Sequence, residues 1–217
     1  MKNYARKLFG CEDVAKIKEA VASVEKVTSG EVLPVVRSYS SRYRLSVFKW
    51  VLVCQIAFVT GWVTVGITLR SGVSRYDLLI FIGAYLLLTL LLILLPEIFP
   101  PFLRLLAGKR GMDEAVTSCA VHSFVRYGVS GTVNRSGILI FISLFEHQIV
   151  ILADKGINDK VSPDTWKSVS DRIAAGMKQG RPAEAVAEAV ESCRALLASS
   201  FPPAADNQNE LPDFIME

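Results

Sequence analysis

Two long apolar runs constrain the fold of this chain more than any other feature of its sequence. Val47–Leu69 contains Lys49 as its only charged residue, and Leu78–Leu95 contains none. A helix needs about 20 mostly apolar residues to cross the core of a bilayer, so both runs predict transmembrane helices. The connection between them, residues 70–77, is too short for a domain. The sequence therefore predicts a transmembrane hairpin whose two outer ends lie on the same side of the lipid bilayer.

Basic residues indicate which side that is. The outer ends of the hairpin are flanked by Arg42, Arg44, Lys49, Arg104, Lys109 and Arg110, whereas the connection carries only Arg70 and Arg75. Because Lys and Arg close to membrane helices are retained in the cytoplasm, we expect both termini to be cytoplasmic. Several prolines interrupt the chain after the second run, which predicts that residues 98–106 lie along the membrane interface.

The rest of the sequence has the spacing of short helices and strands. In chain order the predicted elements are a helix at 12–28, a strand that begins at Glu31, the hairpin, a helix at 113–127, strands at Ile138–Phe145 and Ile149–Ala153, and helices that begin near Pro163 and Pro182. The two later strands are too short to span a bilayer, and residues 146–148 between them predict a tight turn. Pro34, in the first strand, favours an edge or bulged position.

This order of elements predicts one domain that the hairpin interrupts. A strand–helix–strand unit closes as a right-handed crossover between parallel strands, and here the crossover carries the hairpin as an insertion. Neither soluble fragment could bury its apolar face alone. Residues 1–40 and 111–200 are therefore expected to form one α/β domain, with a small mixed sheet sandwiched by helices. Residues 41–110 contain the hairpin, and the polar, Pro-rich residues 201–217 are expected to be a tail.

Several segments of the soluble part resemble the TPM domain family. They are VEKVTSGEVLPVV at Val24–Val36, GILIFISLFEHQIVILADKGI at Gly137–Ile157, the helix that contains Trp166, and FPPAADNQNELPD at Phe201–Asp213. The chain also resembles bacterial members in which a membrane hairpin interrupts the domain, which implies an α/β sandwich attached to the bacterial inner membrane. Some members are described as weak acid phosphatases or calcium binders, and others as assembly or repair factors for membrane complexes. The resemblance implies the fold and leaves the function open.

Composition and motifs exclude several classes of function. A net charge of +3, with basic residues concentrated only beside the apolar runs, does not indicate a nucleic-acid partner. The four cysteines lie far apart without a C-x-x-C pair, which argues against a zinc site or a disulfide framework. The sequence contains no Walker loop, G-x-S-x-G, H-E-x-x-H or EF-hand pattern. No catalytic residue can be assigned, and a non-enzymatic role is favoured.

Acidic residues form the strongest candidate site. If the strands that begin at Glu31 and Gly137 are parallel, both begin at one end of the sheet, and the antiparallel strand before Asp154 finishes there. Glu31 and Asp154 would then be neighbours, and the following loop adds Asp159 and Asp164. Hard oxygen ligands on loops suit Ca²⁺ or Mg²⁺, and paired carboxylates could instead act as acid and base. The alternative is that these acids are helix caps and partners in surface ion pairs.

Three functions remain as interpretations of this sequence. The preferred one is an inner-membrane protein whose cytoplasmic domain binds or assembles a membrane protein partner, aided by a Ca²⁺ or Mg²⁺ ion. The first alternative is a weak metal-dependent phosphatase, although a nucleophile motif is missing and only Arg135 and Lys155 add positive charge near the acids. The second is a structural subunit whose hairpin packs within a larger membrane complex.

Overall fold

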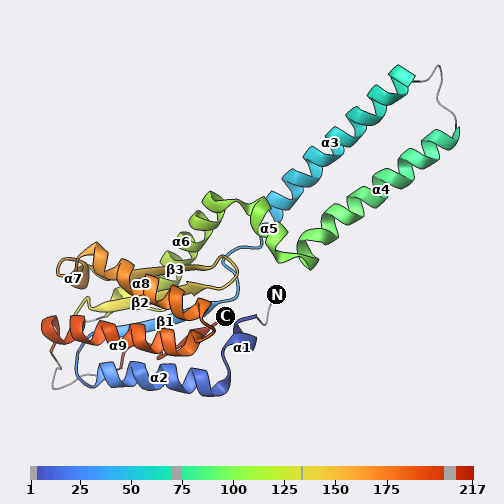
Figure 1. Cartoon of the computed structure of the whole chain (residues 1–217). Helices are drawn as coiled ribbons and strands as arrows, with labels where there is room; N and C mark the ends of the chain where they lie inside the picture. Colours follow the sequence, from blue (N-terminus) through green and yellow to red (C-terminus); the bar gives the residue numbers. More distant parts are fainter. Residues whose placement is uncertain (1–3, 70–74, 133, 203–208) are drawn as a thin grey trace. The chain divides into compact units, whose positions relative to one another are not determined.

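The computed structural model describes residues 4–69, 75–132, 134–202 and 209–217 (Figure 1). The chain divides into two compact units, one formed by Met1–Ser40 together with Asp113–Glu217 and the other by Ser41–Met112. Most of the connection between the two apolar runs, including Arg70, lies outside the described residues.

The first unit is built on a four-stranded mixed sheet with the order β3-β2-β1-β4. Its strands are β1 (Glu31–Arg37), β2 (Gly137–Ser143), β3 (Gln148–Ala153) and β4 (Ile215–Met216). The pairs β1–β2 and β1–β4 are parallel, and the hairpin β2–β3 is antiparallel. The predicted parallel pairing of the first two strands is therefore confirmed, across the intervening insertion.

Helices cover both faces of this sheet (Figure 1). One face packs against α1 (Tyr4–Leu8), α2 (Cys11–Glu25), α8 (Pro163–Lys178) and α9 (Pro182–Ser200), and the other against α6 (Lys109–Arg126) and the turn η1 (Val129–Gly131). Successive strand residues alternate between the two cores, so Val32 and Ile138 belong to the first, and Leu33 and Leu139 to the second. The predicted α/β class, a small mixed sheet sandwiched by helices, is confirmed.

Pro34 occupies a position in β1 that needs no ladder hydrogen bond. The N–H of Glu31 donates to the Ser136 carbonyl at 3.1 Å, so the odd-numbered residues of β1 face β2 and the Pro34 nitrogen faces the other side. On that side β4 pairs only with Val35 and Val36. At the level of Pro34, β1 therefore has a neighbouring strand on one side only, which agrees with the predicted edge character.

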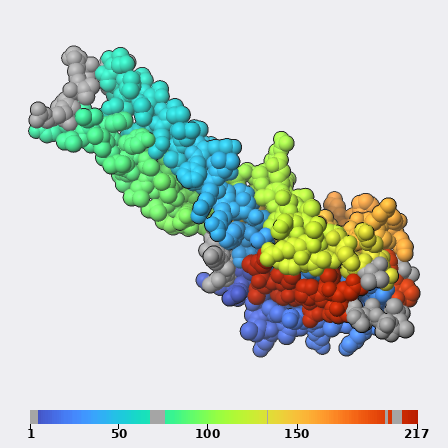
Figure 2. Space-filling view, turned by 180° about the vertical axis from the view of Figure 1, so that it is seen from behind, coloured from blue at the N-terminus to red at the C-terminus, as the bar shows by residue number. Residues whose placement is uncertain are grey.

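The C-terminal residues differ from the predicted tail. Within 209–217, Leu211 is only 6% exposed, and Ile215–Met216 forms β4 beside β1. Figure 2 shows these residues as a dark red strip at the surface, between the yellow-green residues that include α6 and the blue residues that include α2. A two-residue strand has no periodicity that a sequence could display, and its partner strand lies far away in the chain.

The second unit contains the two long apolar helices. They are α3 (Arg44–Leu69) and α4 (Arg75–Ile98), and the shorter α5 (Pro100–Ala107) follows at the predicted interfacial segment. Both α3 and α4 are long and apolar enough to cross a membrane. Only 6% and 0% of the residues in their most apolar windows are buried. An apolar surface of this kind suits lipid, not water.

Contacts between α3 and α4 hold this unit together. The side-chain amide of Gln55 donates to the Thr89 hydroxyl at 2.9 Å, which satisfies a polar group within an apolar stretch. Nearby, the rings of Phe58 and Phe81 stack with their centroids 5.7 Å apart. The two apolar helices therefore pair as a hairpin.

The first unit should fold without the second. We expect a chain in which residues 41–112 are replaced by a Gly/Ser linker of about ten residues, which spans roughly 17 Å on average, to unfold in one cooperative thermal transition. The reason is that both sheet cores are formed within Met1–Ser40 and Asp113–Glu217, and the cost of loop closure changes slowly with loop length. Circular dichroism of the purified shortened chain is the measurement. An aggregated product, or one without a transition, would contradict the insertion of the hairpin into a single domain.

Candidate functional site at the acidic end of the sheet

Three strand ends meet where β1 begins. Glu31 is paired with Gly137, and the N–H of Asp154 donates to the Gly137 carbonyl at 2.9 Å. Alternation along the strands places Glu31, Gly137 and Asp154 on the same face of the sheet, the face that packs against α6. The two carboxylates therefore lie on either side of Gly137, as the predicted topology requires. We name this region, with the acidic residues Glu25, Glu31, Asp154, Glu210 and Asp213, the acidic end.

Glu31 is a buried acid for which the described residues supply no ion-pair partner. Its side chain is 2% exposed. One carboxylate oxygen accepts a hydrogen bond from the Glu210 N–H at 3.5 Å, and the other, Oε2, has no partner among the described residues. Burial raises the pKa of Glu31, and the charges of Glu210 and Asp213 raise it further, while the hydrogen bond from Glu210 acts in the opposite direction.

Glu25, the last residue of α2, shares this environment. Burial, followed by the charges of Glu31 and Asp213, raises the pKa of Glu25 from 4.5 to about 7. The side-chain amide of Asn209 donates to Glu25 Oε2 at 3.2 Å and to Asp213 Oδ1 at 3.1 Å. One amide thus joins the end of α2 to the C-terminal segment, and it brings two like-charged carboxylates together.

Asp154 caps the short helix α7 (Lys155–Asn158) next to the same edge. Its Oδ1 accepts a hydrogen bond from the Lys155 N–H at 2.6 Å and lies 3.9 Å from the guanidinium of Arg135. The Asp154 side chain is buried, whereas that of Arg135 is 69% exposed, so the ion pair is weakened by solvent. The second oxygen, Oδ2, is buried and has no partner within the described part of the chain.

Gly137 allows the turn η1 to close over the sheet between these two acids. A Cβ atom at Gly137 would lie 2.4 Å from the Val129 carbonyl oxygen, closer than any side chain tolerates. Only glycine therefore lets the backbone of η1 approach so closely. The close approach encloses the region between Glu31 and Asp154 on the α6 side of the sheet.

The other predicted site residues lie elsewhere. Asp159 is exposed at the C-terminal end of α7, and Asp164 is exposed in the first turn of α8. No contact joins either residue to Glu31 in the part of the chain that the structure describes. Sequence reasoning missed Glu25 and Asp213, although both adjoin or lie within segments that carry the family resemblance. The signal that pointed to Asp213 was the acid-rich NELPD, which was assigned to a tail.

The acidic end contains carboxylate oxygens whose hydrogen bonding is incomplete. In the part of the chain that the structure describes, two buried carboxylate oxygens lack hydrogen-bond donors, which costs free energy until a proton, a donor or a cation satisfies them. Among the described residues, no three His, Cys, Asp or Glu side chains come close enough to form a ready-made metal site. The acidic end is therefore a concentration of negative charge with two unsatisfied acceptors, without a complete ligand shell.

Comparisons with known proteins agree with this architecture. Residues 109–196 match the family model of the TPM domain. Among solved structures, the NMR structure of BA42 protein from the psychrophilic bacterium Bizionia argentinensis is similar, with a TM-score of 0.56 and 20% sequence identity over 96% of this chain and 95% of that chain. At this identity the similarity concerns the fold alone. No curated protein matches the chain.

The raised pKa of Glu25 predicts how stability depends on pH. Because the folded state holds this proton up to about pH 7 and the unfolded state releases it near 4.5, the free energy of unfolding should fall as pH rises between these values. Glu25 is about half buried, so solvent screening reduces the effect to about 1 kcal/mol. We expect Glu25→Gln to remove this part of the pH dependence and to stabilise the protein by that amount at pH 8. Urea unfolding at pH 5, 6, 7 and 8 is the measurement.

Glu19→Gln is the matched control, since Glu19 is exposed on the same helix. It should leave the pH profile of the wild-type protein unchanged. Parallel profiles for the wild-type chain and Glu25→Gln would show that the folded state does not hold the proton.

Proposed function

We propose that this chain, which carries a TPM domain, is a membrane-anchored binding module that takes up a divalent cation at its acidic end. The observation that supports the proposal is the pair of buried, unpartnered carboxylate oxygens, Glu31 Oε2 and Asp154 Oδ2. Buried acceptors of this kind are rare in folded proteins, and each asks for an explanation. A cation supplies one for both.

The donor set favours Ca²⁺ or Mg²⁺. All the candidate side chains offer carboxylate oxygens, the ligands that these hard cations prefer. Glu31 and Asp154 would hold the ion. Asp213, whose charge raises the pKa values of both Glu25 and Glu31, would add negative charge. The bound ion would neutralise carboxylates that otherwise repel one another.

The apolar helices support an anchoring role. α3 and α4 could embed in a bilayer by their length and composition. With the predicted topology, the hairpin would hold the TPM domain at the cytoplasmic side of a bacterial inner membrane. A module held there would act on a membrane protein partner, either in binding or in assembly. The phosphatase alternative rests on family resemblance, and no side-chain arrangement in the described residues favours it.

Cation binding predicts a higher melting temperature. Ca²⁺ or Mg²⁺ at ten times its dissociation constant should stabilise the detergent-solubilised full chain by about 1.4 kcal/mol, which raises the melting temperature by roughly 3–6 °C. Asp154→Asn and Glu31→Gln should each abolish most of this rise. Differential scanning fluorimetry with millimolar Ca²⁺, Mg²⁺ or K⁺ is the measurement.

The control for this experiment is Asp171→Asn, which removes an exposed acid from α8. This variant should respond to the cation as the wild-type chain does. If neither ion moves the wild-type curve, the acidic end does not bind a divalent cation. Hydrolysis of a generic phosphate ester that is lost in Asp154→Asn would favour the phosphatase instead.

The predicted topology has its own test. Fusions of a reporter that is active only in the periplasm should be inactive after Glu217 and active within the connection at residues 70–77. The reason is the excess of basic residues at the outer ends of the hairpin. An active reporter after Glu217 would show that the domain lies outside the cytoplasm.

A further inference from the structure

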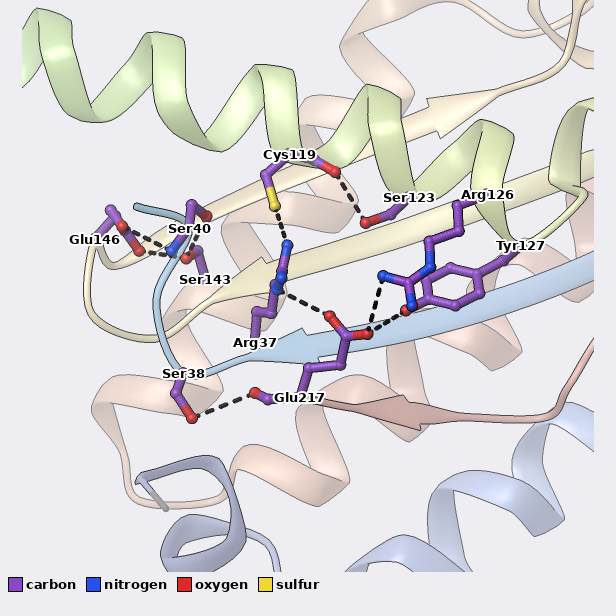
Figure 3. A network of polar contacts seen from close by, with 10 residues as sticks. All are labelled: Arg37, Ser38, Ser40, Cys119, Ser123, Arg126, Tyr127, Ser143, Glu146 and Glu217. Atoms are coloured by element: carbon purple, nitrogen blue, oxygen red, sulfur yellow. Dashed lines mark hydrogen bonds and ion pairs between the residues drawn. The ribbon is translucent and has the colours of Figure 1, made fainter. Parts of the chain in front are cut away.

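The opposite end of β1 holds a carboxylate in a basic pocket. Figure 3 shows the side chain of Glu217 between residues of β1 and α6. Glu217 Oε2 lies 2.9 Å from Arg37 Nε, and Oε1 accepts a hydrogen bond from the Tyr127 hydroxyl at 2.5 Å. Arg126 lies 3.7 Å from the same Oε1. We name Arg37, Arg126 and Tyr127 the carboxylate latch.

Backbone hydrogen bonds hold the same residue on the edge of β1. The N–H of Glu217 donates to the Val36 carbonyl at 2.9 Å, and the N–H of Ser38 donates to the Glu217 carbonyl at 2.9 Å. Ile215 and Met216 pair in parallel with Val35 and Val36. Strand addition to an exposed sheet edge is one of the general ways in which folded domains bind extended peptides. Residues 209–217 thus occupy the β1 edge as such a peptide would.

Side chains of this segment enter both cores. Leu211 and Ile215 pack on the side of α6, whereas Phe214 and Met216 pack on the side of α2. The ring of Phe214 lies 6.3 Å from that of Phe9, which fixes an aromatic position. In strand addition, pockets on alternate sides of the sheet select the side chains of the added strand. The edge of β1 therefore favours a segment with apolar residues followed by one acid.

The latch places two arginines beside the side chain of Glu217. Arg37, Ser38, Tyr39, Arg126 and Glu217 line a pocket of about 270 Å³. Its two guanidinium groups both lie beside the side-chain carboxylate of Glu217. Arginine binds carboxylates with directional, paired hydrogen bonds, which suits recognition of an acidic side chain. The pocket is thus complementary to acidic residues of an incoming peptide.

The strand that this segment forms is short. β4 has only two residues, and of the described residues 209–217 only Leu211 is buried. At its other end, Asp213 lies among like charges and raises the pKa of both Glu25 and Glu31. The latch therefore attracts one end of the segment, while the acidic end repels the other. β1 and β2 pair with each other along their whole length, so their pairing does not involve this segment.

We propose that the β1 edge and the carboxylate latch form a docking groove for an extended acidic segment of a partner protein, which residues 209–217 fill within the same chain. The partner segment has the chemistry of the resident one: an apolar residue, an aromatic residue three positions later, two further apolar residues and then an acid. Binding of the partner displaces residues 209–217 and adds its own parallel strand to β1. The groove is an interaction surface that the chain protects with its own sequence.

Displacement can be measured with the full chain in nanodiscs. A fluorescein-labelled peptide, NELPDFIME, reproduces residues 209–217 and serves as the probe in anisotropy titrations. Glu217→Gln in the chain weakens the resident segment, so the groove is open more often and the apparent affinity for the peptide rises in proportion. We expect the peptide to bind Glu217→Gln roughly fivefold or more tightly than it binds the wild-type chain, because hydrogen bonds to charged groups contribute most to the docked state.

Controls separate the groove from nonspecific binding. Glu188→Gln, an exposed acid on α9, should bind the peptide as the wild-type chain does. A peptide that ends in Gln instead of Glu should bind Glu217→Gln several-fold more weakly, and adding Arg37→Gln should remove most of the binding. In hydrogen exchange, the Ser38 amide should exchange faster in Glu217→Gln, while amides of β2 keep their protection.

Several results would overturn the proposal. The groove does not exchange its occupant if the wild-type chain, Glu217→Gln and Glu188→Gln bind the peptide equally, or if both peptides bind alike. If Glu217→Gln shows no thermal transition, the experiment uses the variant Phe214→Ala instead. If neither variant shows a transition, residues 209–217 are integral to the fold. A wild-type dimer that exchanges residues 209–217, detected by light scattering, would make a second copy the occupant in place of a partner protein.

Discussion

The parallel pairing of β1 with β2 is the contact on which the remaining structure depends. It joins two parts of the chain that the hairpin separates, and its register sets Glu31 against Gly137. From this register follow the two apolar faces, because each strand alternates between the core of α2, α8 and α9 and the core of α6. The same register fixes which residues reach the two ends of β1. Without the pairing, neither fragment has a partner for its apolar side chains.

The two ends of β1 differ in charge. Where the strand begins, carboxylates gather with few balancing cations, and two buried oxygens remain without donors. Where it ends, Arg37 and Arg126 surround one carboxylate. The C-terminal segment lies parallel to β1 and spans the distance between these ends, so its direction matters. A reversed segment would place Glu217 among acids, so the observed direction keeps this carboxylate beside the arginines.

Sequence reasoning succeeded where apolar patterns were long and local. The two apolar helices, the parallel pairing and the β2–β3 turn at His147, whose φ is 52°, followed from runs of residues and from chain connectivity. It did not find β4, since a two-residue strand is stabilised by a distant edge and carries almost no local signal. The same omission concealed the contribution of Glu25 and Asp213 to the acidic end, because Asp213 and Asn209 meet Glu25 only after the C-terminal segment has docked. The latch was missed for the same reason, since Arg37 and Glu217 meet only through that docking.

The C-terminal segment connects the two proposals through thermodynamic linkage. Asp213 contributes its charge to the acidic end only while the segment is docked. A cation held there therefore interacts more favourably with the docked state, and the docked state in turn binds the cation more tightly. A partner that displaces the segment from the latch removes Asp213 from the acidic end. The affinity of the acidic end for the cation then falls. The size of this coupling is limited by the difference in cation affinity between the docked and released states, since a ligand shifts an equilibrium only by its differential binding.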